Sequence, residues 1–150
     1  MPELFILITC LYNHSKIMFK QKIKINFYDC DPAGILFYAN LFKFAHKTYE
    51  ALIESFELED GYFDNENFVV PIIHTEGNYF IPMKPGNEIE VSVYVSQLRN
   101  SSFELTYNFT NENSNTNAQV KTVHVFVEKD SFEKIKVPDE ILKNLEANRG

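Results

Sequence analysis

The chain of 150 residues is long enough for one packed domain, since 45% of its residues are hydrophobic. Its formal net charge of −7 argues against nucleic-acid binding, which depends on clustered Lys and Arg. The two cysteines, Cys10 and Cys30, are too few for a disulfide framework, so we expect a cytoplasmic protein. No set of His, Cys, Asp or Glu has the spacing of a metal site, and we expect no cofactor.

The first segment carries the apolar run "LFILITCLY". Glu3 precedes it without a basic residue, no small-residue cleavage site follows, and nine residues cannot span a bilayer, so we expect neither export nor membrane insertion. Met18 offers a second start directly before "FKQKIKINF". Residues 1–17 are therefore either an N-terminal extension or part of a domain that otherwise covers residues 18–150.

The first predicted elements are a strand and a long helix. "KQKIKINF" alternates, with Ile23, Ile25 and Phe27 on one face, which predicts a half-buried strand. From Tyr38 to about Phe56 the apolar period becomes helical. Two neighbouring stripes make the apolar face of this helix wide: Ala45, Tyr49, Leu52 and Phe56, and beside them Phe42, His46, Tyr49 and Ile53.

Four strand-like segments follow, rich in Val, Phe and Tyr: residues 68–80, 87–98, 101–110 and 118–129. The polar stretch "NENSNTN" between the last two predicts a hairpin loop, and "VPDEILKNLEAN" predicts a short terminal helix because Pro138 and two acids begin it. One long helix followed by antiparallel strands indicates an α+β fold, in which the sheet curls around the helix.

The stretch "DCDPAGILFYANLF" and the order of elements resemble the hotdog-fold acyl-CoA thioesterases of the 4-hydroxybenzoyl-CoA type, over roughly residues 21–130. Within that superfamily "FAHKTYEALI", "FVVPIIHTEGNYFIPMKPGNEI" and "KTVHVFV" look most like the 1,4-dihydroxy-2-naphthoyl-CoA thioesterases of menaquinone biosynthesis. The resemblance implies an acyl-CoA substrate, thioester hydrolysis, and a homodimer or homotetramer.

By this resemblance Asp31 is the catalytic carboxylate, as nucleophile or general base, and the backbone N–H of Tyr38 polarises the thioester carbonyl. Pro32 and Gly34 suit a loop that holds Asp31 just before the helix, whose first N–H groups are unpaired. Turn formation alone also explains Asp29 and Asp31, because Asp before Pro and Gly is a common turn or cap residue.

His46, Tyr49 and Glu50 share one side of the helix and are candidate contacts for an aromatic acyl group. The 4-hydroxybenzoyl enzymes have an acid where this chain has His46. His74 is a further candidate contact from a strand-like segment, and His124 fits the same subfamily pattern. For each histidine, a satisfied position in the core or in a subunit contact is an open alternative.

CoA carries phosphates, so cations are expected near the mouth of the site. The candidates are Lys84, Arg99 and Lys121, with ordinary solvated side chains as the alternative for the lysines. Other functions stay open at this point: hydrolysis of 4-hydroxybenzoyl-CoA or of a short-chain acyl-CoA, a hotdog dehydratase that uses His46 with Glu50, or a non-catalytic acyl-CoA binding module.

Overall fold

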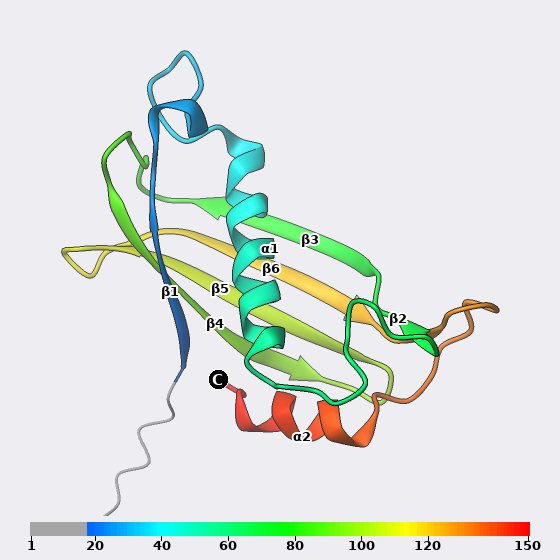
Figure 1. The fold of residues 1–150 in the computed structure, drawn as a ribbon. Helices are drawn as coiled ribbons and strands as arrows, with labels where there is room; N and C mark the ends of the chain where they lie inside the picture. Colours follow the sequence, from blue (N-terminus) through cyan, green and yellow to red (C-terminus); the bar gives the residue numbers. More distant parts are fainter. Residues whose placement is uncertain (1–17) are drawn as a thin grey trace, which may run out of the picture.

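The fold is taken from a computed structural model that describes residues 18–150 (Figure 1). The predicted extension at residues 1–17, with Cys10, lies outside the described residues. Five antiparallel strands form one sheet in the order β1-β4-β5-β6-β3. Their bounds are β1 Phe19–Lys24, β3 Ile72–Tyr79, β4 Glu88–Leu98, β5 Ser102–Asn111 and β6 Thr116–Val125.

The long helix α1, Tyr38–Glu54, lies across one face of this sheet, as Figure 1 shows. The first predicted stripe is buried throughout, with Ala45, Tyr49, Leu52 and Phe56 each at most 8% exposed. The second stripe is only partly buried, because His46 is exposed at the solvent side of the helix. Residues from β4, β5 and β6 close the core from the sheet side, so the predicted α+β arrangement is confirmed.

The first strand is shorter than its alternation predicts. Ile23 and Ile25 are buried as expected, but Phe27 is 86% exposed. The reason is local, because Asn26 and Asp29 form a reciprocal capping box that turns the chain into a 3-10 helix, η1 (Phe27–Asp29). The prediction that Phe27 lies on the buried face was therefore wrong.

The other predicted strands divide at two points. Pro71 separates a short strand β2, Phe68–Val69, from β3, and β2 pairs with β7, Val127–Glu128, outside the main sheet. Proline has no N–H for the ladder, although the carbonyl of Pro71 still accepts a hydrogen bond from Val125 N at 3.1 Å. The predicted terminal helix is α2, Asp139–Ala147, and the residues after it run beside Val95 of β4.

The strand β3 is one edge of the sheet, and β1 is the other. Every residue of β3 is exposed except the half-buried Gly77. A Cβ on Gly77 would lie 2.9 Å from Phe42 Cζ, so the absence of a side chain lets α1 pack close against this strand. The edge consequently carries a row of backbone groups that no strand covers in the described chain.

Candidate active site

The loop between η1 and α1 is anchored by Asp29. Its carboxylate accepts a hydrogen bond from Asn26 N at 2.8 Å, and the side chain is only 5% exposed. Its carbonyl accepts two further bonds, from Phe37 N at 2.9 Å and Asn40 Nδ2 at 2.8 Å. Asp29 is therefore a structural residue that closes the loop onto the start of α1.

Asp31 lies in the turn of this loop. One carboxylate oxygen, Oδ1, accepts a hydrogen bond from Ala33 N at 2.8 Å, and the Asp31 carbonyl accepts one from Gly34 N at 2.9 Å. Gly34 has a φ of 76°, which favours glycine. Within residues 18–150, Oδ2 has no hydrogen-bond partner. Asp31 is thus a turn former that still has one carboxylate oxygen free for chemistry.

The first turn of α1 offers hydrogen-bond donors to a ligand. Phe37, the residue before the helix, provides no side-chain cap. In the described part of the chain, the N–H groups of Tyr38 and Ala39 have no acceptor, whereas Asn40 N bonds to Phe37 O at 2.9 Å. Such groups carry the positive end of the helix dipole and suit a developing oxyanion.

An apolar cavity of about 170 Å³ borders the same loop. Ile35 and Leu36 of the loop line it together with residues 79–83. Tyr79 also donates a hydrogen bond from its hydroxyl to the Tyr38 carbonyl at 2.8 Å. The end of β3 is therefore fixed to the start of α1.

The environment of Cys30, between Asp29 and Asp31, disfavours the thiolate that a nucleophile needs. Burial, and then the carboxylates of Asp29 and Asp31, raise the pKa of its thiol above the ordinary value. A protonated thiol at neutral pH is a poor nucleophile. We therefore do not expect Cys30 to act as the nucleophile of this loop.

His46, Tyr49 and Glu50 do come together in the second half of α1. His46 Nε2 lies 3.3 Å from Glu50 Oε1, and both side chains are about half exposed, at 48% and 50%. The rings of His46 and Tyr49 meet edge to face with centroids 5.5 Å apart. A cavity of about 150 Å³ lies over them, lined by His46, Tyr49, Tyr62, Phe63, Val69, Val70 and Ile72, and we call it the aromatic pocket.

Tyr62 and Phe63 of the aromatic pocket were not anticipated from the sequence. They belong to the irregular segment after α1, where no periodicity indicates which side chains turn inward. Tyr49 donates its hydroxyl hydrogen to Tyr62 Oη at 2.7 Å, and burial raises the pKa of both phenols. Both hydroxyls stay neutral and hold the wall of the pocket in place.

His124 lies beneath Tyr49 as a fully buried core residue. Its ring stacks on Phe103 at 4.7 Å and lies 4.4 Å from Tyr49. Its Nε2 is 2.7 Å from Thr122 Oγ1, which is in turn 3.2 Å from the Tyr107 hydroxyl. Burial, and to a smaller extent His46, lower the pKa of His124 to about 3, so the ring is neutral.

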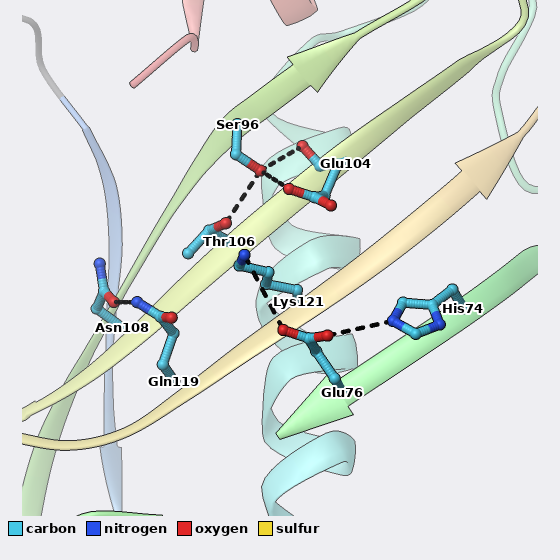
Figure 2. Close-up of polar contacts among 8 residues, drawn as sticks. All are labelled: His74, Glu76, Ser96, Glu104, Thr106, Asn108, Gln119 and Lys121. Carbon is cyan, nitrogen blue, oxygen red and sulfur yellow. Dashed lines mark hydrogen bonds and ion pairs between the residues drawn. The ribbon is translucent and has the colours of Figure 1, made fainter. Parts of the chain in front are cut away.

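His74 and Lys121 lie apart from these groups, on the sheet face away from α1 (Figure 2). There Glu76 is 3.3 Å from His74 Nε2 and 4.0 Å from Lys121 Nζ. On the same face Ser96 donates to Glu104 at 2.6 Å and Gln119 donates to Asn108 at 2.9 Å. The suggested roles of His74 with substrate and of Lys121 with CoA stay predictions.

The other two candidate CoA contacts lie in separate turns. Lys84 is exposed before β4, where its N–H donates to Asn87 Oδ1 at 2.8 Å. Arg99 is in the turn after β4 and donates to Gln97 Oε1 at 2.9 Å. The structure therefore does not bring Lys84, Arg99 and Lys121 together into one cationic site within a subunit.

Two further findings concern the described residues 18–150. No group of three or more His, Cys, Asp or Glu side chains among them is arranged to hold a metal ion. Neither of their α-helices is long and apolar enough to cross a membrane.

Comparison with known proteins places these features in a family. The profile of the thioesterase-like superfamily matches residues 25–145. A 1,4-dihydroxy-2-naphthoyl-CoA hydrolase of Nostoc punctiforme is 33% identical over 127 residues, which cover 83% of this chain and 84% of the relative. The enzyme of the same name from Prochlorococcus marinus subsp. pastoris is 29% identical over 133 residues, covering 85% and 88%.

Solved structures show the same fold. The crystal structure of a 1,4-dihydroxy-2-naphthoyl-CoA thioesterase from Synechocystis superposes with a TM-score of 0.79 at 21% identity, covering 85% of this chain and 95% of that one. The curled antiparallel sheet around α1 is the hotdog fold that the sequence resemblance implies. With a profile match over most of its length and a relative at 33% identity, the chain belongs to the thioesterase-like superfamily.

Proposed function

We propose that this protein is a cytoplasmic acyl-CoA thioesterase that hydrolyses 1,4-dihydroxy-2-naphthoyl-CoA to 1,4-dihydroxy-2-naphthoate and CoA, a step of menaquinone synthesis. The observation that carries the proposal is the loop of residues 29–37, in which Asp31 keeps a free carboxylate oxygen beside a helix start with unpaired N–H groups. The relatives named as hydrolases of this thioester support the choice of substrate.

The chemistry follows from these groups. The thioester carbonyl oxygen accepts a hydrogen bond from the Tyr38 N–H, and Asp31 removes a proton from water as the water oxygen attacks the carbonyl carbon. The C–S bond then breaks, and CoA leaves as a thiolate that takes up a proton. Direct attack by Asp31 is the alternative, through an anhydride that water then opens.

The aromatic pocket cannot serve Asp31 of its own subunit. Tyr49 follows Tyr38 by eleven residues, which is about 16 Å along the helix axis. The aryl ring of an aroyl thioester is bonded directly to the carbonyl carbon, so it lies within a few ångströms of the attacked atom. A complete site therefore needs a pocket from elsewhere.

A homodimer through the β3 edge supplies that pocket. Two copies related by a two-fold axis near the middle of this edge pair their β3 strands in antiparallel directions, which brings the Ile72 end of one strand toward the Tyr79 end of the other. Ile72 lines the aromatic pocket, and Tyr79 bonds to Tyr38. This pairing carries the pocket of one subunit toward Asp31 of its partner, and a tetramer of two such dimers is compatible with it.

Two measurements test the proposal. Steady-state kinetics on 1,4-dihydroxy-2-naphthoyl-CoA, 4-hydroxybenzoyl-CoA and short alkyl-CoA thioesters should give the highest kcat/KM for the naphthoyl ester; an equal or higher value for an alkyl ester contradicts the substrate. Light scattering at micromolar concentration should give at least a dimer mass, and a monomer that is fully active contradicts the shared site.

The contact between His46 and Glu50 favours a second candidate, a hotdog dehydratase that uses a His with an acid. The two activities differ in their products, because a dehydratase keeps the thioester and releases no thiol. A thiol-release assay separates them, and tight acyl-CoA binding without turnover would indicate a binding module.

A further inference from the structure

A second site lies on the other side of α1, between this helix and β1. The two elements are joined by a hydrogen bond from Thr48 Oγ1 to Gln21 Oε1 at 3.2 Å. A groove of about 630 Å³ runs between them. Lys22 and Lys24 line it from β1, and Lys43 and Lys47 line it from α1, so we call it the lysine groove.

The four lysines of the groove are not neutralised by ion pairs with nearby carboxylates. None of its four lysines forms an ion pair with a described residue, whereas the neighbouring Lys20 is 2.8 Å from Glu90. Two carboxylates also line the groove. Asp29 is bonded to the backbone of Asn26, and Glu50 lies beside His46. Glu90 and Glu88 of β4 lie opposite Lys22 and Lys24 of β1, so the positive charge that is least compensated is that of Lys43 and Lys47 on α1.

One end of the groove borders the loop of residues 29–37. Asn26, Tyr28 and Asp29 line one end of it, and the Asp29 carbonyl holds the Phe37 N–H at the start of α1. Lys43 and Lys47 follow Tyr38 by five and nine residues, or about 7.5 and 13.5 Å along the helix axis. A ligand whose carbonyl is bound at Tyr38 can thus extend a flexible arm along α1 to the lysines.

We propose that the lysine groove binds the phosphate groups at the nucleotide end of the acyl-CoA, and this rests on the proposed function. Phosphates attract ammonium groups through charge-assisted hydrogen bonds, and here four such groups gather on one cavity from two elements. This assignment differs from the set Lys84, Arg99 and Lys121, whose members lie in two turns and on the outer sheet face. In the dimer described above, the aryl ring lies on the β3 side of α1 and the phosphates lie on its β1 side.

The test compares two double variants with the same change of charge. Lys43→Gln with Lys47→Gln removes two cations from the groove, and Lys134→Gln with Lys143→Gln removes two exposed cations elsewhere, with circular dichroism as the folding control. Kinetics are measured on 1,4-dihydroxy-2-naphthoyl-CoA and on the N-acetylcysteamine thioester of the same acid, which has no phosphates. Binding of adenosine 3′,5′-bisphosphate is measured by calorimetry.

The groove variant should raise KM for the CoA ester by on the order of tenfold or more at low salt, as expected for losing charged contacts, with kcat nearly unchanged. Its kinetics on the cysteamine ester, and both activities of the control variant, should stay within about twofold of the parent. Adenosine bisphosphate should bind the parent and the control but not the groove variant.

An unchanged KM for the CoA ester, or unchanged binding of the bisphosphate, in a folded groove variant overturns the assignment. A parent protein that cleaves neither thioester contradicts the proposed function instead. In that case the bisphosphate measurement still decides whether the groove binds phosphates.

Discussion

Two regions next to α1 contain titratable side chains that differ in their burial and in their hydrogen bonding. In the loop of residues 29–37, Asp31 is only half-buried and keeps one carboxylate oxygen free. Beneath the second half of the helix, His124 is fully buried between Phe103 and Tyr49, and its pKa falls to about 3. The difference separates a carboxylate that a ligand can reach from an imidazole that is held neutral inside the core.

The largest expected effect is the pH dependence of the free energy of unfolding that the buried His124 causes. The unfolded chain binds a proton at His124 with the ordinary pKa of 6.5, while the folded chain binds it only near pH 3. The full contribution to stability is therefore present above pH 6.5 and is lost as the pH falls toward 3. We expect the free energy of unfolding to lose about 1.4 kcal/mol per pH unit, or about 4 kcal/mol between about pH 6.5 and 3.5.

Urea unfolding of the parent and of His124→Leu at several pH values measures this slope. Leucine fills the site without titrating, so the variant should lose less stability on acidification than the parent by the amount given. Parallel curves for the two proteins contradict a neutral, buried His124.

The next largest effect is the loss of turnover expected when Asp31 in the loop is replaced. Asp31→Asn keeps an acceptor for the Ala33 N–H but removes the negative charge, so kcat should fall on the order of 10²-fold while the fold is kept. Steady-state thiol release with the naphthoyl ester is the measurement. Turnover within a few fold of the parent would remove the mechanism proposed for Asp31.

Asp29→Asn is the matched control for that loss. Asn retains an oxygen for the bond from Asn26 N, and its carbonyl bonds to Phe37 and Asn40 do not involve the side chain. We expect kcat to stay within a few fold and stability to fall by about 1 kcal/mol. If both Asn variants keep normal turnover, the two acids serve only the turn.

A smaller effect tests the aromatic pocket. Phe63 packs edge to face against Tyr49 at 5.6 Å and lines the pocket from an exposed position. Phe63→Ala should lower kcat/KM for the naphthoyl ester about tenfold or more, since a methylene-sized contact in an apolar pocket is worth about 1–3 kcal/mol. Activity on a short alkyl ester should change much less, and an equal loss on both esters would indicate a structural role.

The smallest effect is expected at the N-terminus. The sequence predicts a domain that starts at Met18, and β1 begins at Phe19. A protein lacking residues 1–17 should keep the melting temperature and the kcat of the full chain, measured by scanning calorimetry and thiol release. A large fall in melting temperature would show that the segment packs into the domain.

The sequence by itself determined the elements and most of the core. Helix α1 and the terminal helix follow from apolar period and start signals that are local properties of the chain. The same alternation placed Ile23 and Ile25 correctly, and it failed at Phe27 because a side-chain capping box overrode it. The family resemblance of the loop motif also predicts the roles of Asp31 and Tyr38, which stay predictions.

Only the tertiary structure decided which of these side chains share a site. Strand order makes β3 an edge and places His74 and Lys121 on the face away from α1, apart from His46. The packing of β1 beside α1 gathers Lys22 and Lys43 on one groove, although twenty-one residues separate them in the chain. Such pairings depend on sheet register and on how the helix lies across it, and periodicity within a segment carries no information about either.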